Sequence, residues 1–183
     1  MQNAQCILHS LLHSAFRILH QPAFRISHAV NAYVDALRML GRRELSEAQV
    51  RARLQRRQHT PEEIDTAVDR LRAERALDDV RVAEAIARTQ TSVKRRGKLR
   101  VRRQIEQAGV SAAIARRVTD ETFDALDPEA LIAAALAKRL RGRQHLADDA
   151  EFSRLYRYLI GQGFEPERVL AVLRKTHKGL DGR

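Results

Sequence analysis

The sequence is poor in the residues that build disulfide-bonded, membrane-spanning or strand-rich proteins. Its 183 residues include one cysteine (Cys6), eight glycines, four prolines and no tryptophan. A single cysteine excludes an internal disulfide and a thiolate metal framework, and it fits a reducing, cytoplasmic compartment. No apolar run approaches the roughly 18 residues that a membrane span needs, so we expect no membrane partner. Strand signals are nearly missing as well, whereas helix-forming residues dominate, which predicts an all-α protein.

Acidic residues are too few to balance the basic ones. The chain has 34 lysines and arginines against 23 aspartates and glutamates, which gives a formal net charge of +11 and a pI near 10.9. A summed positive potential of this size favours an anionic partner. That partner can be a nucleic acid or an acidic protein surface, and the charge alone does not decide between them.

The two ends of the chain carry no clear helical pattern. Residues 1–31 lack the basic start, continuous apolar centre and small-residue cleavage site of a secretory signal. We expect them to form a poorly ordered or partly helical extension, and residues 177–183 to form a frayed tail.

The region between the two ends contains an internal repeat. Segments that start at Leu54, Ile105 and Leu159 superpose with offsets of 51 and 54 residues. An apolar segment precedes each copy, and an apolar pair spaced by four follows it on one helical face. The pattern predicts three tandem three-helix repeats in an elongated or curved array, with boundaries at 32–79, 80–127 and 128–176. The apolar pairs are Ile64 and Val68, Ile114 and Val118, and Val169 and Leu173.

Helix-capping residues support this division. Thr60 is followed by Pro61 and, three positions after Thr60, by Glu63, which is the pattern of a capping box. Ser46 and Asp127 precede other expected helices in the same way. Glycines that can adopt a left-handed conformation stand where helices are expected to end, at Gly109 and Gly163.

The segment RRGKLRVRRQIEQAGV, residues 95–110, is a basic helix rather than a disordered tail. Val101, Ile105 and Ala108 converge on one side of this expected helix. The opposite side carries Arg96, Arg100, Arg103 and Gln107 in a row that we expect to face solvent. Between Lys94 and Asp120 the only acid is Glu106, so the positive potential of this row is largely uncompensated.

We predict that these cations bind an anionic partner, although a charged run can also simply solvate a helix. No aromatic residue lies within the row, so a surface that follows phosphates or an acidic protein fits better than a base-stacking surface. The predicted partner-binding residues are Lys94, Arg95, Arg96, Lys98, Arg100, Arg102 and Arg103, with counterparts at Arg51, Arg53, Arg56, Arg57, Arg154 and Arg157.

Candidate catalytic and metal sites have simpler explanations. RRGKLR is no phosphate loop, because Ser92 replaces the first glycine and Leu99 replaces the required hydroxyl residue. His9 and His13 have helical zinc spacing but no accompanying carboxylate. The paired carboxylates Asp78-Asp79 and Asp148-Asp149 are better explained as helix caps. The cluster of Phe152, Leu155, Tyr156, Tyr158 and Leu159 is better explained as core than as a ligand site. We expect no catalytic residue, metal or cofactor.

Several segments together resemble the RecX regulatory proteins. In order they are LRMLGRRELSEAQVRARLQRR, IDTAVDRLRAERALDDVRVAEAIART, RRGKLRVRRQIEQAGV and YRYLIGQGFEPERVLAVLR, within residues 32–176. The most specific pieces are the turn Leu77-Asp78-Asp79 and the basic segment, while Val82 stands where the family usually has phenylalanine. The resemblance implies tandem three-helix repeats that bind the RecA nucleoprotein filament and depress its ATP hydrolysis, strand exchange and coprotease activity. It thereby implies a role in recombination, DNA repair and the SOS response.

A stand-alone helical-repeat protein that binds nucleic acid is the alternative. It would bind bare DNA tightly without any effect on RecA, whereas a RecX-like protein would change RecA activity. We expect a cytoplasmic protein in either case, and a monomer, with an oligomer as the alternative that the sequence leaves open.

Overall fold

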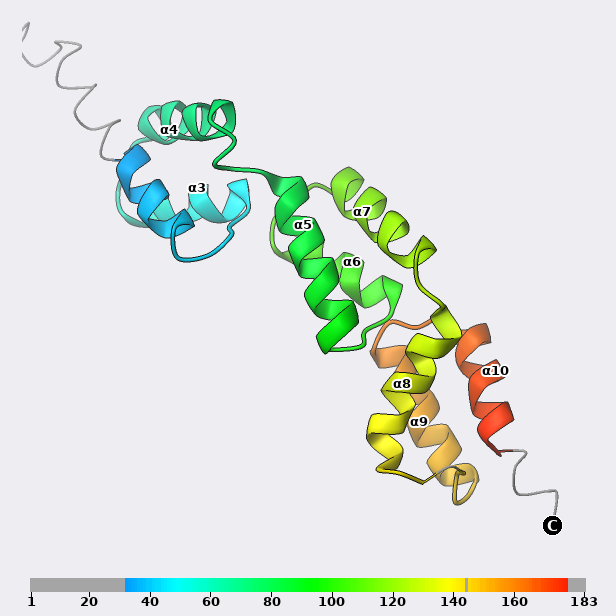
Figure 1. The fold of residues 1–183 in the computed structure, drawn as a ribbon. Helices are drawn as coiled ribbons and strands as arrows, with labels where there is room; N and C mark the ends of the chain where they lie inside the picture. The colour runs from blue at the N-terminus through cyan, green and yellow to red at the C-terminus, as the bar shows by residue number, and fades with distance from the viewer. Residues whose placement is uncertain (1–31, 144, 178–183) are drawn as a thin grey trace, which may run out of the picture. The chain divides into compact units, whose positions relative to one another are not determined.

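The computed structural model describes residues 32–143 and 145–177, and these residues are helical with no strand among them (Figure 1). This confirms the all-α prediction. The described residues belong to two compact units; the first ends at Leu77 and the second begins at Asp78. The predictions for residues 1–31, including His9 and His13, and for the tail beyond residue 177 concern residues outside the described ranges.

The first unit contains a helix over residues 32–40, followed by α3 (Glu47–Arg56) and α4 (Pro61–Ala73). Their apolar faces meet in one core, in which Leu54, Val68 and Leu71 are completely buried. The predicted capping box at Thr60 is present, because its hydroxyl accepts from the amide of Glu63 while the Glu63 carboxylate accepts from the amide of Thr60. Local sequence thus determines where α4 begins.

The second unit begins with α5 (Asp79–Arg88), which continues into the π-helix η1 (Thr89–Val93), and then α6 (Lys98–Gln107) and α7 (Ala112–Asp124). Val101 and Ile105 are completely buried between α6 and its neighbours, as their spacing predicts. Asp78 caps α5 by accepting from the amides of Val80 and Arg81, which confirms the capping interpretation.

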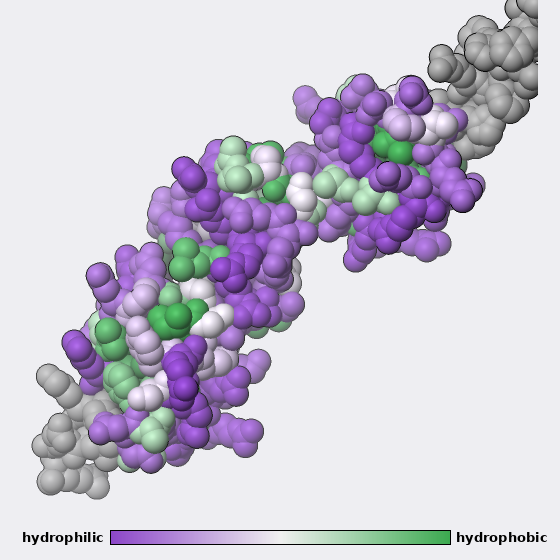
Figure 2. All heavy atoms as spheres, turned by 180° about the vertical axis from the view of Figure 1, so that it is seen from behind, coloured by the Kyte–Doolittle hydropathy of each residue, from purple (hydrophilic) through white to green (hydrophobic). Residues whose placement is uncertain are grey.

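The same unit continues with α8 (Pro128–Leu140), α9 (Asp149–Gly161) and α10 (Pro166–His177). Their core includes Leu155 and Leu159, against which Tyr158 packs as a partly buried residue. The aromatic cluster is therefore part of a core, as predicted. The described residues thus hold three apolar clusters, one for each group of three consecutive helices, which we call the first, central and third trios. The repeat boundaries and the elongated array remain predictions. On the face seen in Figure 2, hydrophilic side chains cover much of each trio and leave separate hydrophobic patches.

Within the second unit, the N-terminus of α6 packs directly on the C-terminus of α9. The amide of Gly97 donates to the carbonyl of Gln162 at 3.0 Å, and the amide of Leu99 donates to the carbonyl of Gly163 at 3.2 Å. A Cβ atom at Gly97 would overlap the backbone of Gly163 and Phe164. Gly97 has an ordinary extended backbone (φ −77°, ψ 165°), so close approach and not conformation requires glycine there. We call this contact the glycine junction.

Candidate anion-binding surfaces

The basic segment of the central trio does not form the continuous solvent-facing row expected from the sequence. Because α6 begins at Lys98, Arg96 precedes the helix, and its guanidinium donates to the Gln90 side chain at 2.7 Å. Arg100 donates to the carbonyl of Gly161 at 2.6 Å, across the glycine junction. The prediction that Arg96 and Arg100 share a solvent-facing helical row is therefore wrong. Periodicity within one helix could not reveal these contacts, since the partners lie in other elements.

Other members of the segment are neutralised by acids. Lys98 pairs with Asp120 at 3.0 Å, and Arg102 pairs with Glu106 at 3.1 Å, both on partly exposed surfaces. Pairs of this kind contribute little to stability, but they reduce the local positive potential. Arg95 and Arg100 donate to backbone carbonyls. Among the seven cations of the segment, only the side chains of Lys94 and Arg103 therefore have no hydrogen bond or ion pair in the part of the chain that the structure describes, and both are exposed.

Among the predicted cations of the first unit, Arg51 and Arg57 are likewise paired with acids. Arg51 lies between Glu47 and Asp65, and the hydrogen bonds that it donates to Asp65 and Glu47 raise its pKa. Arg57 pairs with Asp35 at 3.0 Å. Burial would raise the pKa of Asp35, but hydrogen bonds from His59 and Arg57 lower it.

Arg53 belongs to a basic groove in the first unit. The groove has a volume of about 570 Å³, and no acid lies among its described lining residues, which include Arg42, Arg43, Arg53, Arg56 and Arg57. Burial and the neighbouring charges of Arg43 and Arg56 lower the pKa of Arg53. The guanidiniums of Arg53 and Arg56 also donate to carbonyls one turn earlier in α3, which satisfies some of their donors.

A larger basic groove lies in the second unit, where the segment after η1 approaches α8 and α9. We call it the α8–α9 groove; its volume is about 750 Å³. Of the predicted cations it collects Lys94, Arg95 and Arg154, whereas Arg157 donates to the carbonyl of Ser153 within α9. The remaining cations of its lining are Lys138, Arg139, Arg141 and Arg143.

Sequence reasoning missed those four cations, although a signal was present. They form the run KRLRGR, residues 138–143, at the C-terminal end of α8. Basic residues at the end of a helix also interact favourably with the helix dipole, which makes such a run unremarkable when it is considered alone. Only the fold brings it next to Lys94 and Arg95 from the central trio.

Among the described residues that line the α8–α9 groove, Glu151 is the one carboxylate, and it is already engaged. Arg143 binds it with two hydrogen bonds, at 2.6 and 3.0 Å, and the amide of Ala147 donates to it at 2.8 Å. Arg154 lies 3.5 Å from the same carboxylate. The hydrogen bonds from Arg143 and Ala147 lower the pKa of Glu151 to about 2, so it is fully ionised at neutral pH.

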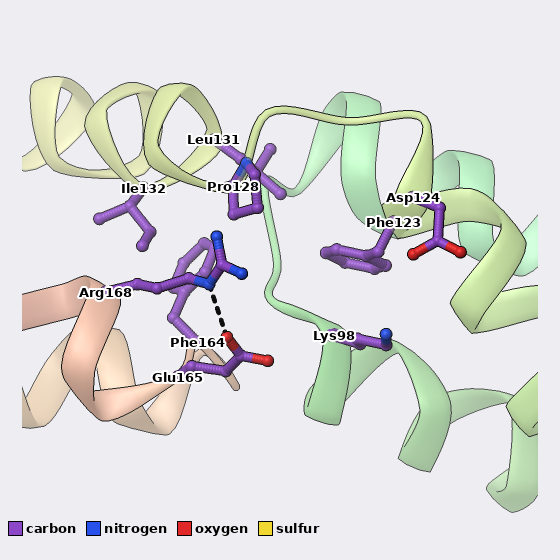
Figure 3. A pocket seen from close by; sticks show the side chains of 9 residues that line it. All are labelled: Lys98, Phe123, Asp124, Pro128, Leu131, Ile132, Phe164, Glu165 and Arg168. Atoms are coloured by element: carbon purple, nitrogen blue, oxygen red, sulfur yellow. Dashed lines mark hydrogen bonds and ion pairs between the residues drawn. The ribbon is translucent and has the colours of Figure 1, made fainter.

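A smaller pocket lies between the central and third trios (Figure 3). It encloses about 100 Å³, and its lining combines apolar side chains, among them Phe123 from α7, Leu131 from α8 and Phe164, with two acidic and two basic ones. At its edge Arg168 pairs with Glu165 at 2.7 Å. This pocket is small, and both of its basic residues, Lys98 and Arg168, are paired with acids, so it does not share the anion-binding character of the grooves.

The described residues contain neither a candidate metal-binding cluster nor a candidate membrane-spanning helix. No group of three or more histidines, cysteines, aspartates or glutamates in residues 32–143 and 145–177 could hold a metal ion. None of the helices in those ranges is both long and apolar enough to cross a membrane.

Fold and surface together define an all-helical scaffold of helix trios that carries basic grooves. A family model described as the first three-helix domain of RecX matches residues 32–71. "Regulatory protein RecX" of Chromohalobacter salexigens is 33% identical over 135 residues, which cover 74% of this chain and 86% of the relative. "Regulatory protein RecX" of Geobacillus kaustophilus is 34% identical over 143 residues, but this chain covers only 52% of its length. The chain belongs to the RecX family of regulatory proteins, which confirms the resemblance.

Solved structures support the same fold. The crystal structure of RecX from Lactobacillus salivarius superposes with a TM-score of 0.64 at 16% identity, over 82% of this chain and 97% of that one. The crystal structure of another regulatory protein RecX gives a TM-score of 0.66 at 19% identity, over 81% of this chain and 72% of that one.

Proposed function

We propose that this protein binds the RecA nucleoprotein filament in the cytoplasm and restrains RecA's ATP hydrolysis, strand exchange and coprotease activity. The observation that carries the proposal is membership in the RecX family, through a relative that is 33% identical over 74% of this chain. The excess of positive charge supports it, because a nucleoprotein filament presents both DNA phosphates and acidic protein surface. A protein of this kind acts by occupying the filament and needs no catalytic residue.

The exposed cations without partners suggest how the filament is contacted. Lys94 and Arg103 are the exposed members of the basic segment whose side chains make no hydrogen bond or ion pair with a described residue. Arg100, in contrast, supports the glycine junction through its hydrogen bond to Gly161. Reversal of Arg100 would therefore disturb the fold as well as the surface, and Lys94 and Arg103 are the better residues to test.

The experiment measures DNA-dependent ATP hydrolysis by RecA at increasing concentrations of this protein. We expect the wild type to inhibit, and the double variant Lys94→Glu, Arg103→Glu to inhibit more weakly while it keeps its helical circular dichroism. The matched control is Arg116→Glu with Arg174→Glu, which reverses two exposed charges elsewhere in the second unit and should inhibit like the wild type. If the wild type leaves RecA ATPase unchanged, the proposed function is wrong.

A stand-alone nucleic-acid-binding protein is the second candidate, and the α8–α9 groove favours it because seven cations meet there around one engaged carboxylate. Fluorescence anisotropy with labelled single- and double-stranded DNA, measured with and without RecA, separates the two candidates. Saturable binding to bare DNA together with no effect on RecA activity would favour this second function.

A further inference from the structure

The α8–α9 groove is the strongest concentration of unbalanced charge in the described part of the second unit. Its cations come from two trios: Lys94 and Arg95 follow η1, whereas the KRLRGR run and Arg154 belong to the region of α8 and α9. The carboxylate of Glu151 offsets one of seven charges and is held by Arg143. Like charges gathered in this way repel one another, and a bound polyanion would relieve that repulsion.

Two arginines of the groove occupy backbone conformations that L-residues rarely adopt. Arg95 and Arg141 both have φ of 51°. At Arg141, the C-cap of α8, glycine would be the favoured residue, since it has no Cβ to strain the left-handed region. A cation is present there in spite of that cost. Strained positions of this kind tend to occur where the side chain has a function.

The groove is also partly organised in advance. The guanidinium of Arg95 donates to the carbonyl of Ala134 at 2.9 Å, which ties the segment after η1 to α8. The guanidinium of Arg139 stacks 4.1 Å from the centre of the Tyr158 ring. Side chains held in place lose less conformational entropy when a ligand binds.

The lining favours phosphate over an acidic protein. Its apolar members Ala135 and Leu155 are buried beneath the surface, so the groove lacks the exposed apolar anchor that protein interfaces commonly use. Tyr158 is the one aromatic residue among the lining residues, and Arg139 already covers a face of its ring. Guanidinium groups match phosphate oxygens with two parallel hydrogen bonds.

We propose that the α8–α9 groove binds consecutive phosphate groups of a nucleic-acid strand without contacting its bases. The biological setting rests on the proposed function, since the strand would be the DNA of the filament. Lys94, Lys138 and Arg141 are the direct contacts, whereas Arg95 and Arg143 position the groove through Ala134 and Glu151. Binding is therefore insensitive to base sequence and decreases steeply with salt.

The test uses the full chain and fluorescence anisotropy, without RecA. The probe is a labelled oligothymidylate of about 12 nucleotides, a length within the usual range of single-strand sites. The groove variant combines Lys138→Ala with Arg141→Gly, and the control combines Arg116→Ala with Arg174→Ala. Two lost phosphate contacts should lower the slope of log K against log salt by about 1.4, at roughly 0.7 per contact for single strands. The control should keep the wild-type slope.

One further measurement distinguishes a lost contact with the nucleic acid from a lost fold. A second distinguishes phosphate from other anionic ligands. Arg141→Gly alone should raise the thermal unfolding midpoint, because it removes backbone strain, and yet weaken oligonucleotide binding. An abasic oligomer with the same number of phosphates should bind as tightly as oligothymidylate, and tripolyphosphate should compete. If polyglutamate of equal charge displaces the probe as well as tripolyphosphate does, an acidic protein is the better ligand and the proposal is wrong.

An unchanged salt slope for the groove variant, or an equal loss in the control, would also overturn the proposal. The RecA ATPase assay and the DNA-binding assay can refute their two proposals separately. A wild type that binds DNA through the groove but leaves RecA ATPase unchanged would retain the groove and remove the proposed function. If a groove variant loses DNA binding but still inhibits RecA, both the groove proposal and the proposed function stand, and inhibition is assigned to contacts with RecA itself.

Discussion

Replacement of Gly97 by alanine should loosen the contact between the central and third trios. The new Cβ would overlap the backbone of Gly163 and Phe164, neither of which can rotate away as a flexible side chain would. The backbone at the start of α6 must therefore move away from the backbone that follows α9. Since the backbone conformation of Gly97 suits alanine, any loss of stability reports on this close approach alone.

The expected magnitude follows from the hydrogen bonds that cross the junction. The amides of Gly97 and Leu99 donate two of these bonds, at 3.0 and 3.2 Å, and the guanidinium of Arg100 donates the third to the carbonyl of Gly161 at 2.6 Å. At about 1 kcal/mol net for each bond, their loss costs about 3 kcal/mol. An overpacked core substitution costs a similar amount.

Hydrogen exchange is the suitable assay, because a chain with two compact units need not unfold in one step. A local loss of about 3 kcal/mol should accelerate exchange of the Leu99 amide by about a hundredfold. The control is Gly161→Ala at the end of α9, where an added Cβ meets nothing within 4 Å. Alanine is also the better helix former by about 1 kcal/mol, so this control should be neutral or stabilising. Equal protection of Leu99 in Gly97→Ala and wild type would refute the reasoning.

Three further substitutions test the acid response, a helix cap and the core. The pKa of Glu151 in the folded protein is about 2, below its ordinary 4.5. The ionised carboxylate therefore stabilises the fold fully above pH 4.5, and this contribution is lost as the pH falls towards 2. The urea unfolding midpoint of Glu151→Gln should change less over that interval than the midpoint of the wild type. Thr60→Ala should cost about 1 kcal/mol in thermal unfolding through loss of the capping box, whereas exposed Thr66→Ala should cost less. Ile105→Ala should cost about 2–5 kcal/mol in urea unfolding, and a similar cost for the 58% exposed Leu99→Ala would contradict the assigned core face.

The features that the sequence predicted well depend on residues close together in the chain. The capping box needs only Thr60 and Glu63, three positions apart, and it is present. Val101 and Ile105 are both completely buried, because a spacing of four places two side chains on one helical face wherever the helix lies. Such patterns establish helices and their inner faces without any knowledge of the tertiary structure.

The contacts of the basic segment could not be predicted because they join distant positions. Arg100 and its acceptor Gly161 are 61 residues apart, and Arg95 and its acceptor Ala134 are 39 apart. Helical periodicity assigns a residue to the outer face of its own helix, but it does not show which neighbouring element meets that face. The role of Gly97 is hidden for the same reason, since its space is taken up by Gly163.

Residues at equivalent repeat positions also differ in chemistry. His59 stands where the later repeats have Val110 and Phe164, both of which are buried. The half-buried imidazole of His59 is paired with Asp35 at 3.2 Å, which provides the partner that a polar group needs when it is withdrawn from water. The repeat alignment predicts that the position faces inward, but not that a carboxylate must accompany it.

Part of the high arginine content has a structural cause. Arg53, Arg56 and Arg157 donate to carbonyls one turn earlier in their own helices, whereas Arg95 and Arg100 donate to carbonyls of other helices. Small three-helix cores bury little apolar surface, so arginines that bind carbonyls of another trio, as Arg95 and Arg100 do, help to hold the trios of the second unit together. A hydrogen bond to a neutral carbonyl leaves the guanidinium charge in place, whereas an ion pair with a carboxylate, as at Arg51, Lys98 and Arg102, offsets it. The positions of the cations without an acidic partner, such as those gathered in the α8–α9 groove, therefore define the candidate binding surface better than the net charge does.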